Sequence, residues 1–329
     1  MTIQRPGRGS RIMGIGAYRP KRIVGNAELV QSTGRSDTWI QRRTGIVERR
    51  RAEPDETVMD MAVEASHKAL ADAGVPPERV DMVLLSSMSN VRQSPAGAPE
   101  VAHRLGVGSA ALDLDAACAG FCYALGVADG LVRSGTAEHV LLIGSDKMSD
   151  IVDPGDASAA FLFADGAGAM VVGPDRRQGI GPTIWGSDGG QRRLIAHSAS
   201  WTEYRDSPER PWPTMRMAGT EVFRWAVAKI PEVAGRALAA ARVDAADLDA
   251  FVPHQANMRI TDVLTDRLAL PPHVAVARDI AQSGNTSAAS VPLAIDRLRE
   301  TGAVAPGGRA LLVGFGAGLA WAAQVVRLP

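Results

Sequence analysis

The chain has 329 residues, of which 46% are hydrophobic and 22% charged, a composition typical of a soluble globular protein with a sizeable core. Its 36 basic and 36 acidic residues balance, which argues against nucleic acid or an anionic membrane as a partner. No apolar run reaches the roughly 18 residues of a membrane span, and residues 1–11 lack the apolar region of a secretory signal. The two cysteines, Cys118 and Cys122, are too few for a disulfide framework, so we expect a cytoplasmic protein with reduced thiols.

Helices followed by short apolar strands recur along the chain. A helical pattern at 63–73 leads to a strand at 80–85, and later units pair 119–132 with 139–144 and 222–241 with 248–252. Apolar strands between helices are typical of sheets covered on both faces, which predicts an α/β fold. Residues 186–217, rich in Gly, Ser, Arg, Trp and Pro, are predicted to form an irregular surface or substrate-facing segment.

A weak internal repeat predicts a duplicated fold. Residues 68–75 resemble residues 236–243 at an offset of 168 positions, and 165–169 resemble 315–319 at an offset of 150. Coincidence between two Ala-rich stretches is the alternative interpretation. A duplication would divide the chain into halves at residues 1–175 and 176–329, with loops of different length between equivalent elements.

The first candidate catalytic residue is Cys118. An apolar strand ends before it, small residues flank it, and a helical pattern begins near it. The orphan amides and the dipole of a helix N-terminus favour a thiolate, so we expect the pKa of this nucleophile to be lowered. The alternative is a buried cysteine that acts as a small hydrophobe, which is the interpretation we favour for Cys122.

Two further candidates follow predicted strands or turns. His254 comes directly after the strand at 248–252, and strand ends are where α/β proteins place their sites. Asn285 lies in a turn before a helical pattern and could instead be a helix cap. At the 168-residue offset, the loop of Asn285 is equivalent to the loop of Cys118 in the other half, and His254 is equivalent to Ser86 at the end of the matching strand. This equivalence predicts that Cys118, His254 and Asn285 face one cleft.

Other site types are not indicated. The glycines at 314–318 lack the third glycine and the downstream βαβ unit of a dinucleotide-binding loop. No metal-ligand spacing is present, and we expect neither a metal nor a cofactor.

The motifs at 116–121, 165–168, 253–257 and 284–290 together resemble β-ketoacyl-acyl-carrier-protein synthase III, and residues 39–45 resemble that family's entrance motif. The resemblance implies a thiolase-like, five-layered α-β-α-β-α fold of two duplicated halves, usually a homodimer. It implies that Cys118 takes an acyl group from coenzyme A, while His254 and Asn285 hold a malonyl thioester during decarboxylation. A neutral His254 suits this role, because it must also accept the thiol proton.

The resemblance also implies binding residues. The backbone amides of Cys118 and Ala317 match the oxyanion hole, and Trp39 and Arg43 match residues that hold the coenzyme A nucleotide. Arg224 and Arg259 match basic positions that dock the acidic carrier protein. A partly exposed core anchor is the alternative for Trp39, and a solvated surface position is the alternative for the two docking arginines.

Two departures from the family pattern concern the starter. Ala157 stands where the family commonly has an arginine that stacks on adenine, so coenzyme A could bind weakly or the primer could arrive on a carrier protein. Ser94 stands where larger residues often gate the acyl pocket of the neighbouring subunit, which predicts a longer or branched starter.

We therefore predict a decarboxylative condensation of an acyl-CoA starter with malonyl on an acyl carrier protein, in fatty-acid or polyketide synthesis. Two alternatives remain. A thiolase-fold acyltransferase would move the acyl group to a hydroxyl or amine without condensation, but it has less need of Asn285. A non-catalytic partner subunit would have lost the nucleophile, whereas Cys118 is present.

Overall fold

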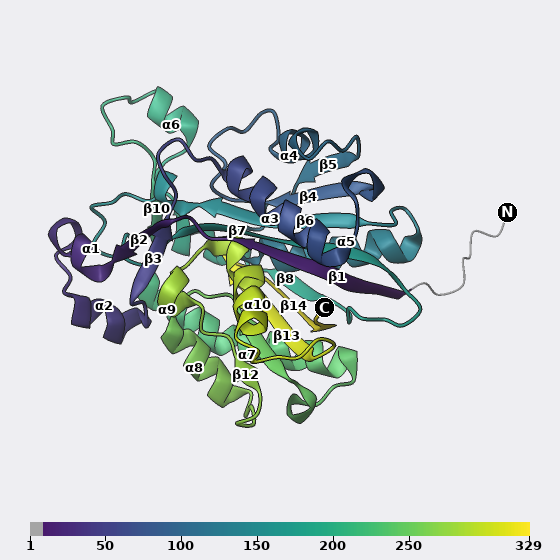
Figure 1. Cartoon of the computed structure of the whole chain (residues 1–329). Helices are drawn as coiled ribbons and strands as arrows, with labels where there is room; N and C mark the ends of the chain where they lie inside the picture. The colour runs from purple at the N-terminus through teal and green to yellow at the C-terminus, as the bar shows by residue number, and fades with distance from the viewer. Residues whose placement is uncertain (1–8) are drawn as a thin grey trace.

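Two five-stranded mixed sheets form the frame of the molecule (Figure 1). The computed structural model describes residues 9–329, so residues 1–8 of the N-terminal stretch lie outside the described part. The first sheet has the order β1-β7-β6-β4-β5 and the second has the order β12-β11-β13-β14-β8. The first comprises β1 (Gly9–Tyr18), β4 (Met82–Ser86), β5 (Ala110–Asp113), β6 (Val140–Lys147) and β7 (Asp165–Asp175). The second comprises β8 (Ile184–Ser187), β11 (Ala250–Pro253), β12 (Ala275–Val276), β13 (Arg309–Gly316) and β14 (Ala320–Arg327).

The two sheets repeat one pattern of strand directions. In each sheet the outermost strand is antiparallel to its neighbour, a second antiparallel pair follows, and the last strands are parallel. All strands of the first sheet come from residues 9–175, and those of the second come from residues 184–327. The fold is therefore the duplicated, thiolase-like α/β architecture that the sequence predicts, while the boundary at residue 175 stays a prediction.

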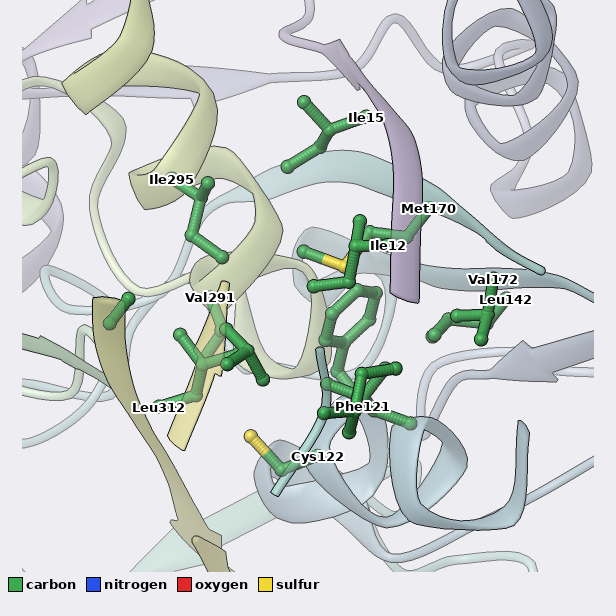
Figure 2. Packing of buried hydrophobic residues seen from close by; sticks show 14 of the residues in the cluster. Ile12, Ile15, Phe121, Cys122, Leu142, Met170, Val172, Val291, Ile295 and Leu312 are labelled. Carbon is green, nitrogen blue, oxygen red and sulfur yellow. The ribbon is translucent and has the colours of Figure 1, made fainter. Parts of the chain in front are cut away.

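The helices form three layers, one between the sheets and one on each outer face. Helices α5 (Gly120–Ser134) and α10 (Ser290–Glu300) fill the centre, where Phe121, Val291 and Ile295 pack with side chains of both sheets (Figure 2). Helices α3 (Val58–Ala73) and α4 (Ala98–Arg104) cover the first sheet, and α7 (Gly219–Ala241) and α8 (Met258–Arg267) cover the second. Apolar burial on both faces of each sheet is the main stabilising contribution of this arrangement.

Smaller elements surround this frame. They are α1 (Asn26–Thr33), α2 (Asp37–Thr44), α6 (Trp201–Arg205), α9 (Ile280–Ser283), the strand pair β2 (Arg22–Gly25) and β3 (Glu48–Arg51), and the strand pair β9 (Ile195–His197) and β10 (Met215–Met217). Short 3₁₀ turns lie at Pro77–Arg79, Ala117–Ala119, Met148–Asp150, Gly189–Leu194, Ala245–Asp247 and Ser287–Ala289. Among residues 9–329, no helix is long and apolar enough to cross a membrane.

The predicted helix–strand units are present, with boundaries that move by a few residues. The prediction for 186–217 is wrong in part, because β9, α6 and β10 give this segment regular structure. Strands β9 and β10 pair antiparallel, and α6 lies in the excursion between them (Figure 1). Each of these elements has only three to five residues, which is too short for hydrophobic periodicity to reveal.

Close packing of α3 on β1 depends on a glycine. A Cβ atom on Gly16 would lie 2.2 Å from the carbonyl oxygen of Ala65 in α3. We expect Gly16→Ala to lower the free energy of unfolding by about 1–3 kcal/mol, because the helix must move away from the strand. Gly25→Ala is the matched control, since nothing lies within 4 Å of a Cβ at that position. Urea denaturation of both variants measures the effect, and equal stability of the two would contradict it.

Candidate active site

A cavity of about 480 Å³ brings Cys118, His254 and Asn285 together. Each side chain follows the end of a strand or precedes a helix of the central layer. Cys118 lies just before α5, His254 follows β11, and Asn285 lies before α10. The parallel pairing of β11 with β13 places Pro253 beside Val313, and the amide of His254 donates to the Val313 oxygen at 2.7 Å.

The turn that carries Cys118 packs tightly against the end of β13. A Cβ atom on Gly316 would lie 2.7 Å from the Cβ of Cys118, so only glycine fits there. Ala117 adopts a positive φ of 48°, which turns the chain sharply before the thiol. The side chain of Cys118 is almost fully buried but still lines the cavity.

The expectation of a lowered thiol pKa is wrong. Burial raises the pKa of Cys118 to about 12, against a smaller opposing effect of the Ser287 hydroxyl. The thiol precedes α5 in a short 3₁₀ turn, and desolvation of the anion outweighs the favourable helix end. Cys118 is therefore a neutral thiol at neutral pH, and a nucleophilic role would require removal of its proton.

A neutral thiol predicts a characteristic pH dependence of alkylation. We expect the rate of Cys118 alkylation by iodoacetamide to rise about tenfold per pH unit between pH 6 and 9, because the thiolate fraction rises in that proportion below the thiol pKa. Mass spectrometry of the modified protein, with Cys118→Ala as the background, measures the rate. A plateau beginning below pH 8 would instead indicate a thiolate in the resting protein.

His254 is buried and neutral. Its Nδ1 atom lies 2.7 Å from the hydroxyl oxygen of Ser290, the first residue of α10. The ring of Phe315 meets the imidazole edge-to-face at 5.3 Å between ring centroids. Burial lowers the pKa of His254 to about 3, so the imidazole carries no charge between pH 5 and 9. Because Nδ1 contacts Ser290, Nε2 is the ring nitrogen left for chemistry in the cavity.

Backbone bonds on both sides hold Asn285 in place. Its amide donates to the oxygen of Leu162 and its carbonyl accepts from the amide of Ala164, both at 2.9 Å. Its Oδ1 atom accepts from the amide of Ser287 at 3.0 Å. With Oδ1 engaged, the side-chain NH₂ group is the part of Asn285 that can donate to a ligand in the cavity.

The amides of Cys118 and Ala317 are the predicted donors of an oxyanion hole. Among residues 9–329, neither donates a hydrogen bond to another protein group. Ala317 follows Gly316, the last residue of β13, and a Cβ atom on Gly316 would also lie 3.1 Å from the Sγ atom of Cys118. Ala317, Ala117 and Ala116 also line a second cavity of about 490 Å³. Free amides beside a nucleophile are the arrangement that an oxyanion hole requires.

The mouth of the main cavity is basic and aromatic. Trp39 and Arg43, from α2, line it together with Arg259 from α8 and Ala157. The guanidinium of Arg35 lies 4.7 Å from the centre of the Trp39 ring, and its Nε donates to the Ala157 oxygen at 3.4 Å. The position where the family commonly has an arginine is thus covered by a guanidinium from another segment.

Two predicted binding residues line neither of the two cavities described above. Arg224 is exposed on α7, beside the cavity residues Phe223 and Trp225. Ser94 is exposed in the loop between β4 and α4, and its role as a gate stays a prediction.

Sequence reasoning missed two polar residues that support the catalytic side chains. Ser290 is the first residue of α10 and ends the motif that includes Asn285, so its place beside a turn was a usable signal. Asp146 is a fully buried carboxylate near the end of β6. Burial raises its pKa to about 6, although several hydrogen-bond donors oppose the shift. Its neighbours come from distant segments, so no local pattern points to it.

Comparison with known proteins settles the family. Residues 112–189 match the 3-oxoacyl-[acyl-carrier-protein] synthase III family, and residues 238–328 match the C-terminal part of that family. The β-ketoacyl-[acyl-carrier-protein] synthase III of Streptomyces glaucescens is 49% identical over 100% of both chains. The chain belongs to the β-ketoacyl-[acyl-carrier-protein] synthase III family. It is therefore similar throughout its length to condensing enzymes.

Solved structures agree with this family. The priming β-ketosynthase of the R1128 polyketide biosynthetic pathway has a TM-score of 0.97 and 49% identity, covering 99% of this chain and 98% of its own. The synthase III of Pseudomonas aeruginosa PAO1 has a TM-score of 0.90 and 39% identity, covering 98% and 99%. Among residues 9–329, no group of three or more His, Cys, Asp or Glu side chains could hold a metal ion.

Proposed function

We propose that this protein is an acyltransferase that condenses an acyl-CoA starter with malonyl on an acyl carrier protein, releasing carbon dioxide. The observation that carries the proposal is that Cys118, a neutral His254 and Asn285 line one cavity. A thiol with His254 as its proton acceptor would suffice for acyl transfer, whereas a second hydrogen-bond donor beside His254 suits the stabilisation of an enolate. The product would begin a fatty-acid or polyketide chain.

In the first half-reaction, the Sγ atom of Cys118 attacks the thioester carbonyl of acyl-CoA. His254 Nε2 takes the thiol proton and returns it to the sulfur of the departing coenzyme A. The amides of Cys118 and Ala317 stabilise the negative charge on the acyl oxygen. Tight burial of the thiol keeps water away from the acyl-enzyme that forms.

In the second half-reaction, the malonyl carboxylate leaves as carbon dioxide and its electron pair forms an enolate. His254 Nε2–H and the NH₂ group of Asn285 donate to the enolate oxygen. The enolate carbon then attacks the acyl carbonyl to form the new carbon–carbon bond, and the resulting adduct expels Cys118 as a thiolate. A proton from solvent restores the neutral thiol. Ser290 supports both steps, because its hydroxyl can donate to or accept from Nδ1 and so allows either tautomer of His254.

We assign coenzyme A recognition to the mouth of the cavity. Trp39 offers an aromatic face, and Arg43 and Arg259 offer charge to phosphates. The guanidinium of Arg35 over Trp39 supplies the charge that Ala157 lacks. This placement supports a primer that arrives on coenzyme A.

The exposed guanidinium of Arg224 supports docking of an acidic carrier protein. We expect Arg224→Glu to raise the KM for malonyl carrier protein about tenfold, because the reversed charge repels acidic residues of the partner. Acylation of Cys118 by acyl-CoA should stay at the wild-type rate. Arg236→Glu, an exposed arginine further along α7, is the matched control and should change neither quantity. Equal KM values for the two variants would contradict the docking role.

The edge of the first sheet supports a homodimer. Within the part of the chain that the structure describes, β5 pairs with β4 alone, and Leu112 on it is 42% exposed. An exposed edge strand with an apolar side chain is suited to pair with a second copy. Sedimentation velocity should show a dimer, and a monomer at micromolar concentration would contradict this assignment.

Two measurements on the wild-type protein test the proposed reaction. Intact-protein mass spectrometry after incubation with acyl-CoAs of varied length should show an acyl adduct on Cys118. The preferred chain length tests the predicted role of Ser94 as the gate of the acyl pocket. Addition of malonyl carrier protein should then release carbon dioxide and give a β-ketoacyl product. An adduct without carbon dioxide release would indicate simple acyl transfer, and no adduct at all would contradict the nucleophile.

A further inference from the structure

Asp146 is a buried carboxylate without a cation. It is 0% exposed near the end of β6, and among residues 9–329 it forms no salt bridge. The adjacent Lys147 donates instead to the carbonyl oxygens of Glu53 and Pro54. A buried charge is stable only when hydrogen-bond donors replace the water it loses. The hydrogen-bond donors around Asp146 therefore identify the segments that its carboxylate holds in place.

The two oxygens of Asp146 contact different parts of the fold. Oδ1 accepts hydrogen bonds from the hydroxyls of Ser87 and Ser89 and from the amides of Met88 and Ser89, at 2.7–3.1 Å. Oδ2 accepts from the amide of Ala288 at 3.0 Å. One carboxylate thus ties the loop after β4 to the turn at residues 285–289, which we name the Asn285 turn.

Two consecutive backbone amides of the Asn285 turn donate hydrogen bonds to side-chain oxygens. The amide of Ser287 donates to Oδ1 of Asn285, and the next amide, of Ala288, donates to Asp146. The hydroxyl of Thr286 is buried without a hydrogen-bond partner, whereas the Ser287 hydroxyl lies close enough to Asp146 and Cys118 to oppose the burial that raises the pKa of both groups. The backbone of β6 also lies against the turn, since a Cβ atom on Gly144 would be 2.7 Å from the Ala288 oxygen.

We infer that Asp146 is a positioning residue for condensation, which fixes the Asn285 turn so that the Asn285 side chain donates to the enolate. This inference rests on the proposed function. The slowing is specific to the second half-reaction, because attack by Cys118 on acyl-CoA does not use Asn285. The charge of Asp146 adds to burial in raising the pKa of Cys118, so its loss would not slow that attack. A residue that only stabilised the fold would influence both half-reactions in the same proportion.

The substitution Asp146→Asn tests the inference. The new NH₂ group takes the place of one carboxylate oxygen. It then faces another donor, either the Ala288 amide or the donors of residues 87–89, so the link between these residues and the Asn285 turn is broken and the turn shifts. We expect the rate of carbon dioxide release from malonyl carrier protein to fall about tenfold to a hundredfold, the effect of a misplacement near 1 Å. The rate of acyl-adduct formation on Cys118 should stay within about threefold of the wild type.

Asp129→Asn is the matched control. Asp129 is a buried carboxylate on α5 that accepts from Ser10 and Gln178 and lines none of the cavities described above. This variant should show the same ratio of the two rates as the wild type, whatever its thermal stability. The same ratio in Asp146→Asn would overturn the inference, as would a parallel loss of both rates.

Gly144→Ala provides a second test if Asp146→Asn does not fold. It displaces Ala288 without changing any charge, so the same selective loss of condensation is expected. The inference would also be overturned if both rates in this variant were unchanged, or if both fell in the same proportion. The wild-type assay distinguishes failure of the proposed function from failure of the role of Asp146. A wild-type protein that releases no carbon dioxide would contradict the proposed function itself.

Discussion

Replacing Cys118 with alanine will abolish acyl-adduct formation and condensation. Cys118 is the one thiol among the described residues that line the cavity, and the loss of a covalent catalyst lowers the rate by about 10³-fold or more. The fold should persist, because alanine is smaller than cysteine and keeps the backbone of the turn. Intact-protein mass spectrometry with acyl-CoA, together with circular dichroism, measures both effects.

Cys122→Ala is the matched control for this prediction. Cys122 is also fully buried and lies one helical turn further along α5, where it packs in the central layer (Figure 2). We expect this variant to retain the adduct and the condensation rate, at a cost of about 1 kcal/mol in stability from the small void. If acyl labelling survived in Cys118→Ala and disappeared in Cys122→Ala, Cys122 would be the nucleophile and the assignment to Cys118 would be wrong.

The meeting of Cys118, His254 and Asn285 in one cavity could be predicted because each residue follows a local signal. Cys118 and Asn285 lie in small-residue turns before helices, and His254 follows a strand. The weak repeat then placed the three at equivalent ends of two similar sheets. These signals are contained in short stretches of sequence, so periodicity and turn chemistry are enough to read them.

The electrostatics of the site were not predictable in the same way. The raised pKa of Cys118 results from burial, and Gly316, which packs against its Cβ atom, comes from the other half of the chain. Asp146 likewise meets Ser87 and Ala288, which lie 59 and 142 residues away in the sequence. Burial and such long-range partners are set by the assembled fold, and no local pattern encodes them.

Replacing Asn285 with alanine will separate the two half-reactions. The side chain supplies a donor to the enolate oxygen, where negative charge develops only after the malonyl carboxylate leaves. Loss of one such donor lowers the rate of condensation by about 10²–10³-fold, which corresponds to about 2.7–4 kcal/mol of transition-state stabilisation. Acylation of Cys118 should stay within about threefold of the wild type, because that step uses His254 and the two backbone amides.

Asn257→Ala and His254→Ala complete the comparison. Asn257 lines the same cavity, but its side chain caps α8 and donates to the Arg43 oxygen, so its loss should leave carbon dioxide release near the wild-type rate. His254→Ala should slow both half-reactions, because Nε2 accepts the thiol proton in the first and donates to the enolate in the second. If Asn285→Ala condensed at the wild-type rate, His254 alone would stabilise the enolate, and Asn285 would serve only to shape the turn before α10.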